Sequence, residues 1–367
     1  MEWPLHIIEP TLVSDAGHCS SFVRSICASA DRSATINLWA GNGYETTSLP
    51  SLVMIKGYFR RRLRRVQSYF LYRALLRQPG RIFIATAGRT DLLLLEWATR
   101  RQIPSGKVFC FFHWLNLNVR KQEQLSRIAR RQPAIILLAP TELVAAQLRE
   151  CGFHNVRVVP YPITPSSMSD DEQAPVFRHI LSAGAARADK GIAHVVSFIE
   201  YLADIGAAIP VVVQTSPDHY DKCDDTTRKA LERLVALSYP SLRVNSETLP
   251  AAEYHSLFQG AICLQLYNQR DFADRISGIT LDAMSCGAPV VTLSGTWIAR
   301  TIKRFSAGEV LEVPDPQLLL ATVRRIVADY ECYQQNACKA GEVLQIENSG
   351  RHLYRMLTEW PARGTCD

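Results

Sequence analysis

Short apolar runs recur along almost the whole chain, and longer stretches with apolar residues at helical spacing separate most of them. Short β-rich apolar runs are typical of strands that are buried on both faces. They predict a first series of strands at 5–10, 34–40, 81–86, 107–112, 134–139 and 156–160, and a second at 178–184, 209–215, 241–247, 261–266, 288–293 and 309–313. Because helical stretches such as 140–152 and 226–238 separate the strands, the pattern predicts an α/β protein with parallel, doubly wound sheets.

A segment rich in Pro, Ser and acidic residues, PYPITPSSMSDDEQAPVF at 160–177, separates the two series. It lacks apolar periodicity, which is typical of a linker. We therefore expect one Rossmann-like domain at 1–165, a linker at 166–177 and a second Rossmann-like domain from residue 178, with a cleft between the domains. Open parallel sheets bind ligands at the carboxyl ends of their strands, so this cleft is the expected ligand site.

Composition narrows the class of protein. The chain has 367 residues, of which 47% are hydrophobic and 21% charged, as in ordinary folded domains. No window holds the roughly 18 uninterrupted apolar residues of a membrane-spanning helix, and the N-terminus lacks the pattern of a secretory signal. The ten cysteines form no CxxC pair. We therefore expect reduced thiols, no zinc site and a cytoplasmic protein.

The net charge of +6 is unevenly distributed. Residues 55–77 contain many arginines, and apolar residues lie between them at helical spacing, which predicts a basic amphipathic helix. The apolar residues are Phe59, Leu63, Val66 and Phe70, and the arginines proposed to bind a membrane are Arg60, Arg61, Arg62, Arg64 and Arg65. The helix has two main interpretations, a solvated basic face or a contact with anionic lipid on the inner membrane surface. Nucleic acid is the weaker third interpretation, because no binding motif accompanies the arginines.

A loop rich in small residues opens the second series in RHILSAGAARADKG. Gly184 follows the strand, and Arg187 and Lys190 lie three residues apart, before a helix that is expected to begin near Gly191. Backbone N–H groups at a helix start and two cations favour a bound phosphate. In the alternative interpretation both are surface cations, and Asp189 caps the helix.

A second polar cluster follows a later strand, in DRISGITLDAMSCGAPVV at 274–291. Ser277 and Gly278 would present free N–H groups at the start of a helix, and Asp282 would lie in its first turn. A carboxylate there could bind the vicinal hydroxyls of a sugar, or it could simply stabilise the helix dipole. Asp274, eight residues earlier, is the second carboxylate of the cluster.

Together, GAARADKG and DRISGITLDAMSCGAPVV resemble the nucleotide-sugar half of GT-B glycosyltransferases, in particular glycosyltransferase family 4. Members of that family carry G-R-x-x-x-x-K-G and then E-x7-E followed by A-M-x-x-G-x-P-V-V. This chain has Asp at both acidic positions, and the resemblance extends over about residues 178–330.

The resemblance implies a role for each matching residue. Arg187 and Lys190 would bind the donor diphosphate, and Asp282 would hold the ribose. Asp274, or Arg275 beside it, would contact the donor sugar. Further donor contacts are implied for Gly184, Ser277, Gly278, Ile279 and Thr280.

The first half fits the same family. Gly17 and His18 match the glycine loop that faces the donor, and His113, at the end of the strand in VFCFFHWLN, matches a histidine near the sugar. His113 could also be a strand-end histidine bonded to the backbone. By the same resemblance, residues 341–367 would form a C-terminal helix that packs on the N-terminal domain, and 178–340 would be the nucleotide-sugar domain.

The resemblance implies transfer of a sugar from a UDP- or GDP-sugar to a lipid-linked or polysaccharide acceptor, with retention of configuration and with no metal or other cofactor. The products would be cell-surface polysaccharide or glycolipid, and the expected catalytic residues are His113, Asp274, Arg187 and Lys190. The alternatives are a nucleotide-sugar epimerase or a phosphorylase of the same fold, and a non-catalytic module that binds a sugar nucleotide or a membrane.

Overall fold

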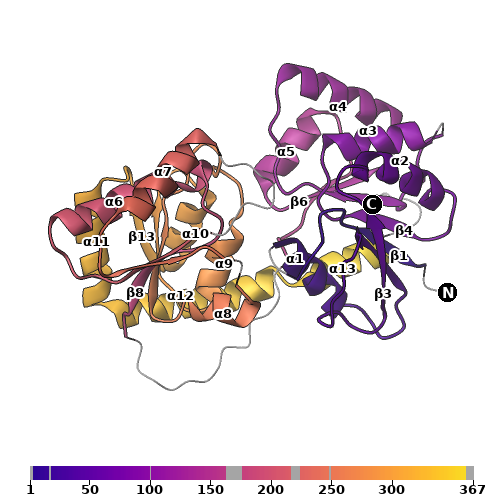
Figure 1. The fold of residues 1–367 in the computed structure, drawn as a ribbon. Coiled ribbons are helices and arrows are strands. Elements are labelled where there is room, and N and C mark those ends of the chain that lie inside the picture. The colour runs from indigo at the N-terminus through magenta and orange to yellow at the C-terminus, as the bar shows by residue number, and fades with distance from the viewer. Residues whose placement is uncertain are drawn as a thin grey trace. The chain divides into compact units, whose positions relative to one another are not determined.

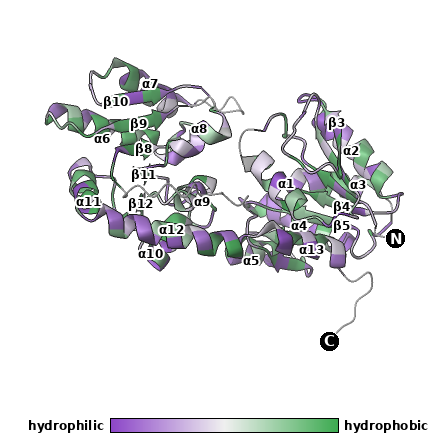
Figure 2. Ribbon diagram, turned by 90° about the horizontal axis from the view of Figure 1, so that it is seen from below, coloured by the Kyte–Doolittle hydropathy of each residue, from purple (hydrophilic) through white to green (hydrophobic). Residues whose placement is uncertain are grey.

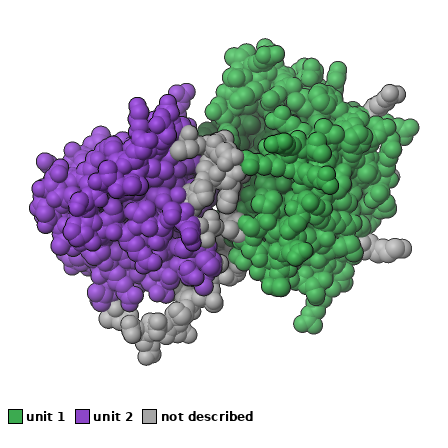
Figure 3. All heavy atoms as spheres, viewed as in Figure 1, with its two compact units in different colours: residues 1–165, 347–367 green, residues 166–346 purple. Residues whose placement is uncertain are grey.

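The chain divides into two compact units, residues 1–165 with 347–367 (unit 1) and residues 166–346 (unit 2) (Figure 3). The computed structural model describes residues 3–15, 18–99, 101–162, 176–215, 224–247 and 249–360, apart from the side chains of residues 18 and 251. Most of the predicted linker at 166–177 lies outside the described residues. Each unit is built around its own parallel sheet (Figure 1).

The sheet of unit 1 has seven strands in the order β3-β2-β1-β4-β5-β6-β7, all parallel. They are β1 (Leu5–Ile8), β2 (Ile36–Gly41), β3 (Val53–Phe59), β4 (Arg81–Ile84), β5 (Val108–Phe111), β6 (Ile136–Ala139) and β7 (Val156–Val158). The direction of winding reverses between the neighbours β1 and β4. At such a switch point the loops diverge to opposite faces and leave a crevice at the carboxyl ends of the strands.

Helices cover both faces of this sheet, and they carry hydrophobic and hydrophilic residues on different sides (Figure 2). They are α1 (His18–Ala28), α2 (Arg64–Leu75), α3 (Arg89–Ala98), α4 (Val119–Arg131), α5 (Glu142–Glu150) and α13 (Gly350–Glu359). Helices α2 to α5 form one buried core with alternate strand residues such as Ile82 and Ile84. On the other face, Phe22 of α1 packs against Phe83 and Phe111, and α13 packs beside α1.

Unit 2 has a six-stranded parallel sheet in the order β10-β9-β8-β11-β12-β13. Its strands are β8 (His179–Ser182), β9 (Val211–Gln214), β10 (Leu242–Asn245), β11 (Ala261–Gln265), β12 (Val290–Leu293) and β13 (Gly308–Leu311). The winding reverses between β8 and β11.

The helical elements of unit 2 are η1 (Ala188–Lys190), α6 (Ile192–Asp204), α7 (Asp225–Ala236), α8 (Ala251–Ser256), α9 (Gly278–Ser285), α10 (Trp297–Phe305), α11 (Pro316–Ala328) and α12 (Tyr330–Glu347). Helices α6, α7 and α11 share one core with the sheet. Gly341 of α12 packs closely on α9, because a Cβ at this position would lie 2.4 Å from the carbonyl oxygen of Met284. Because α12 spans Tyr330–Glu347, it runs without a break through residue 341, where the C-terminal segment was predicted to begin.

The α/β, doubly wound fold class and all twelve predicted strands are confirmed. The helix predicted over 55–77 is wrong in its first part, because residues 53–59 form β3 and the helix begins at Arg64. Strand β3 pairs only with β2 at the edge of the sheet, so only Val53 and Phe59 of its residues are buried. Lys56 and Gly57 interrupt its apolar run, which explains why the pattern of a buried strand is missing.

Candidate functional site

The two polar clusters of unit 2 follow neighbouring strands on either side of its switch point. The loop with Arg187 and Lys190 follows β8, the segment 274–282 follows β11, and β8 and β11 pair in parallel. Both clusters therefore lie at the carboxyl edge of one sheet, where the crevice of a doubly wound fold forms.

Two glycines let the loop after β8 approach the second cluster. Gly184 has φ +88°, and a Cβ there would lie 2.4 Å from Ile279 Cδ1 and 3.1 Å from Lys190 Nζ. Gly191 has φ +73°, and a Cβ there would lie 1.9 Å from the carbonyl oxygen of Leu266. Since L-residues rarely adopt these angles, both positions require glycine. The loop is thereby held against β11 and α9.

Arg187 and Arg275 converge on one carboxylate. Arg187 forms a two-pronged bond with Asp189, with Nε–Oδ1 and Nη2–Oδ2 distances of 2.8 and 2.7 Å. Arg275 Nη1 lies 3.4 Å from Asp189 Oδ2, and its guanidinium lies over the ring of Phe272. Burial and the charge of Arg187 lower the pKa of Arg275. Two guanidiniums that share one carboxylate leave a positive charge, which suits a phosphate.

Asp189 does not cap a helix, so this part of the alternative interpretation is wrong. The N-cap of η1 is Arg187, and Asp189 lies within η1, where its carboxylate binds the arginines. Lys190 follows, with Nζ 5.8 Å from the centre of the Tyr267 ring. Its charge opposes the rise in the pKa of Asp282 that burial causes.

Helix α9 begins at Gly278, as predicted. Ser277 is its N-cap, and Ser277 Oγ accepts a bond from the backbone N–H of Thr280 at 3.3 Å. The hydroxyl of Thr280 donates to Gln265 Oε1 at the end of β11, 2.5 Å away. Apart from the chain neighbours of Gly278 and the backbone of its own helix, no described atom lies within 4 Å of a Cβ built on Gly278. The start of α9 is therefore well fixed and open in front of Gly278.

Asp282 is the fifth residue of α9, counted from Gly278, so it lies in the second turn and not in the first. The backbone N–H groups in the second turn are already bonded within the helix, so the dipole explanation for this acid is wrong. The hydroxyl of Tyr254, in α8, donates to Asp282 Oδ2 at 3.0 Å. Burial raises the pKa of Asp282 to about 6, although the Tyr254 hydrogen bond and the charge of Lys190 oppose the rise.

Asp274 is held by an ion pair that the sequence did not predict. Arg300 of α10 places Nη2 2.7 Å from Asp274 Oδ1. The other oxygen, Oδ2, is buried and has no hydrogen-bond partner among the described residues. A buried carboxylate oxygen without a partner is rare in folded proteins, and it can accept a hydroxyl from a ligand.

In unit 1, His113 follows β5 at the carboxyl edge of the sheet, beside the end of β4. Its Nε2 lies 2.8 Å from the carbonyl oxygen of Ala85, so Nε2 donates and carries the proton. The ring packs among Phe22, Phe111 and Tyr161 at centroid distances of 5.0 to 5.3 Å. The backbone bond expected of a strand-end histidine is therefore present. Gly17 lies outside the described residues, and so does the side chain of His18, the first residue of α1.

Sequence reasoning missed Glu9, which lies just after β1 at the switch point of unit 1. It is fully buried and accepts bonds from the backbone N–H of Thr11 at 3.0 Å and from the hydroxyl of Thr86 at 2.6 Å. Burial raises its pKa. Sequence reasoning also missed Tyr254 and Arg300. Both contact the predicted acids from distant parts of the chain, and neither belongs to a recognisable motif.

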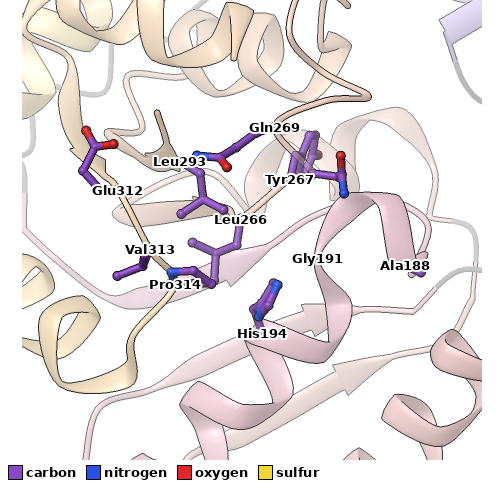
Figure 4. A pocket seen from close by; sticks show the side chains of 11 residues that line it. Ala188, Gly191, His194, Leu266, Tyr267, Gln269, Leu293, Glu312, Val313 and Pro314 are labelled. Carbon is purple, nitrogen blue, oxygen red and sulfur yellow. The ribbon is translucent and has the colours of Figure 1, made fainter. Parts of the chain in front are cut away.

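A pocket of about 250 Å³ lies beside the cation cluster (Figure 4). It is lined by Ala188, Gly191, His194, Leu266, Tyr267, Asn268, Gln269, Leu293, Glu312, Val313 and Pro314. None of the predicted donor contacts that the structure describes lines it, so those residues lie at the sheet edge outside this pocket.

Two further observations concern other kinds of site. Within the described ranges, no three His, Cys, Asp or Glu side chains are grouped as a metal site would require. No helix in the same ranges is long and apolar enough to cross a membrane.

Solved structures share this fold over nearly the whole length of the chain. The structure of HepE from Anabaena in complex with UDP-glucose has a TM-score of 0.70 at 12% identity, covering 97% of this chain and 98% of that one. WaaG, a glycosyltransferase involved in lipopolysaccharide biosynthesis, has a TM-score of 0.66 at 13% identity, covering 96% and 99%. Sucrose-phosphate synthase from Thermosynechococcus elongatus has a TM-score of 0.67 at 13% identity, covering 97% of both chains.

No protein-family model matches the sequence, and no curated protein matches it by sequence. Identities this low establish the fold alone. The chain therefore has the fold of the GT-B glycosyltransferases, which confirms at the level of the fold the resemblance carried by its two motifs.

Proposed function

We propose that this protein is a glycosyltransferase that moves a sugar from a nucleotide-sugar donor, a UDP- or GDP-sugar, to an acceptor. The observation that carries the proposal is the placement of a cationic loop and an acidic segment on the two sides of one switch point, after β8 and β11. The same fold occurs in HepE, which was solved with UDP and with UDP-glucose. Cations and acids at one sheet edge suit a ligand with phosphates at one end and hydroxyls at the other.

Each part of the donor has a proposed partner. The diphosphate binds Arg187, Lys190 and Arg275, of which the two arginines share the carboxylate of Asp189. The N–H groups of Ser277, Gly278 and Ile279, at the start of α9, add donors of the kind that bind phosphate, whereas that of Thr280 already donates to Ser277. The ribose hydroxyls bind Asp282, and the donor sugar binds Asp274 through its unpartnered Oδ2.

The proposed reaction breaks the bond between the anomeric carbon and the diphosphate oxygen, and the electron pair leaves with the nucleoside diphosphate. The acceptor hydroxyl bonds to the same carbon and gives its proton to the leaving phosphate, on the same face of the sugar. This route retains the anomeric configuration. Arg187 and Lys190 stabilise the charge that grows on the leaving group, so these side chains can do what a metal ion does elsewhere. His113 is proposed to contact the donor sugar, as the family resemblance implies.

The proposed acceptor is a lipid-linked sugar or a polysaccharide, in cell-surface polysaccharide or glycolipid biosynthesis on the cytoplasmic side. The likeness to WaaG, which acts in lipopolysaccharide biosynthesis, supports this choice of acceptor.

The first test is a thermal-shift screen against a panel of UDP- and GDP-sugars, because a ligand that binds the folded state raises the melting temperature. One donor should raise it, and the Arg187→Ala and Lys190→Ala variants should lose most of the shift. Lys229→Ala and Arg324→Ala remove exposed charges from α7 and α11 and should keep it. If no donor shifts the melting temperature, the proposal is wrong.

Turnover then separates the alternatives. Transfer to an acceptor should fall about 100- to 1,000-fold in the Arg187→Ala and Lys190→Ala variants, as expected when a group that stabilises the leaving charge is lost. Conversion of the nucleotide sugar without any acceptor would indicate an epimerase, and binding without turnover a non-catalytic module. NMR of the product reads the anomeric configuration, and inversion would exclude the same-face route.

A further inference from the structure

Helix α2 has two apolar faces. One face carries Leu71, Tyr72 and Leu75, which are buried in the core of unit 1. The other, which includes the N-cap residue Leu63, carries three large apolar side chains that are exposed to solvent. These are Leu63, Val66 and Phe70, which are 49%, 56% and 59% exposed. At about 100° per residue, the two groups point roughly 150° apart around the helix axis.

The exposed group, which we call the outer face of α2, is not explained by packing. Leu63, Val66 and Phe70 follow each other at spacings of three and four residues, so they form one row along the helix. Phe59, which the sequence pattern placed in the same row, belongs to β3 and is buried. The row therefore consists of the three exposed residues alone.

The outer face lies in the most basic part of the chain. Residues 46–90 contain ten Lys and Arg and no Asp or Glu, whereas the whole chain has a net charge of +6. The rest of the chain is therefore net negative. The exposed arginines on α2, in the turn before it and just after its end are Arg60, Arg61, Arg62, Arg64, Arg65, Arg73 and Arg77.

The acids of the neighbouring helix α3 are engaged elsewhere. Asp91 accepts bonds from the backbone N–H of Gly88 and from the hydroxyl of Tyr72. Glu96 is buried and pairs with Arg131 of α4 at 2.8 Å. The charge of Arg64 also acts on Asp91 and opposes the rise in its pKa that burial causes, so Asp91 offsets part of that one charge. Among the described residues, Glu96 pairs with Arg131 of α4 and with no arginine around the outer face.

We propose that the outer face of α2 binds the surface of an anionic lipid bilayer. Arginines attract anionic headgroups, each contributing about a fivefold gain in binding near the surface. Leu63, Val66 and Phe70 would enter the boundary between headgroups and acyl chains, where exposed apolar area leaves water. A nucleic acid would use the arginines but not the apolar row, which is why lipid is the better partner.

This inference goes beyond the proposed function, since the outer face belongs to unit 1 and contains none of the proposed donor contacts. A helix that lies on the membrane would bring unit 1 to an acceptor anchored in lipid.

The test measures co-sedimentation of the full chain with vesicles of phosphatidylcholine, with and without phosphatidylglycerol, at physiological salt. Two triple variants separate the contributions, L63S/V66S/F70S for the apolar row and R62Q/R65Q/R73Q for the charge. A third variant, K229Q/R243Q/R324Q, removes three exposed charges from unit 2 and is the matched control.

The wild-type chain should bind the anionic vesicles and not the neutral ones. The charge variant should bind about 100-fold more weakly, the apolar variant at least about tenfold more weakly, and the control within a few fold of wild type. Because the substituted side chains are exposed, all three variants should fold and keep the thermal shift with the sugar nucleotide. If the wild-type chain shows no thermal shift with any sugar nucleotide, the proposed function is wrong, but vesicle binding still tests this inference.

Absence of wild-type binding to anionic vesicles would overturn the inference. So would an apolar variant that binds as tightly as wild type, because the contact would then be charge alone. A third outcome is that the chain does not bind vesicles but retards RNA in a gel-shift assay. If only the charge variant loses this RNA binding, the partner is nucleic acid instead.

Discussion

Tyr254 donates a hydrogen bond to the carboxylate of Asp282 across 3.0 Å, from α8 to α9. Burial and the neighbouring Asp282 raise the pKa of Tyr254 well above its ordinary value, so the tyrosine stays protonated and remains the donor. The bond in turn lowers the pKa of Asp282. Tyr254 is therefore a positioning residue for the acid that is proposed to hold the ribose.

Replacing Tyr254 by Phe should weaken binding of the sugar nucleotide about tenfold at pH 7, because a hydrogen bond to a charged group is lost and Asp282 is no longer held in place. Isothermal titration calorimetry measures this. Tyr239→Phe is the matched control, since its hydroxyl donates to the carbonyl oxygen of Ile209 in the core. That variant should lower the melting temperature but leave the affinity unchanged. Equal affinities for Tyr254→Phe and wild type would remove Tyr254 from the site.

Donor binding should weaken as the pH falls through about 6, because Asp282 has a pKa of about 6 in the folded protein against an ordinary value of 3.8. A protonated acid accepts hydroxyl hydrogens poorly, so the loss should approach tenfold per pH unit below 6. The effect of this group on folding has the opposite sign. Between pH 3.8 and 6 the folded state binds more protons than the unfolded state, so the contribution of Asp282 to the free energy of unfolding rises as the pH falls.

The measurement is the affinity for UDP-glucose between pH 5 and pH 8. Asp282→Asn should flatten the profile, and Tyr254→Phe should shift its midpoint upward, because the bond that lowers the pKa is lost. A midpoint that stays at about 6 in Asp282→Asn would assign the titration to another group.

Asp274 and Asp282 should bind different parts of the donor. Asp274→Asn should weaken binding of a nucleotide sugar about tenfold and leave binding of the nucleotide alone unchanged, because the unpartnered Oδ2 is proposed to bind the sugar. Asp282→Asn should weaken both, because both ligands carry ribose. Isothermal titration calorimetry with the nucleotide and with the nucleotide sugar measures both affinities. Arg300→Gln is the control for loss of the ion pair alone. A similar loss for both ligands in Asp274→Asn would contradict the assignment.

Replacing two glycines of the site by alanine should have different effects on the free energy of unfolding. Gly184→Ala should lower the free energy of unfolding by about 1–3 kcal/mol and weaken donor binding, because its φ is +88° and the new methyl group would displace Ile279 and Lys190. Gly278→Ala should leave stability unchanged or raise it by about 0.5–1 kcal/mol, because it lies at the start of α9 with open space in front. Chemical denaturation measures both values. A stable, fully binding Gly184→Ala variant would show that the loop is not tightly packed.

The C-terminal helix should depend on Arg81. Its guanidinium donates to the carbonyl oxygens of Leu357 and Trp360, at 2.6 and 2.7 Å, and so joins the end of α13 to β4. Arg81→Gln should lower the free energy of unfolding of unit 1 by about 2 kcal/mol, since charged hydrogen bonds are lost. Calorimetric unfolding measures this, with the exposed Arg77→Gln as control. No loss of stability would mean that α13 is held by its apolar contacts alone.

The central strands of both sheets could be predicted because a strand buried on both faces leaves a continuous apolar run, as in 134–139. Strand β3 could not, because Lys56 and Gly57 interrupt its apolar run and the arginines that follow fit the pattern of a helix. The start of α9 was predicted from Ser277 and Gly278, a local capping signal. The turn in which Asp282 lies was not, because Asp282 is the fifth residue of a helix that begins at Gly278 and therefore lies in its second turn.

The sequence by itself determined the order of strands and helices and the chemistry of the loops after β8 and β11, because periodicity, capping and turn residues act between neighbours in the chain. Only the tertiary structure decided what those residues touch. The partner of Asp282 lies 28 residues away in the chain, and the partner of Asp274 lies 26 residues away. It also decided that α2 has a second, exposed apolar face, because burial depends on which elements pack against a helix and not on its own pattern.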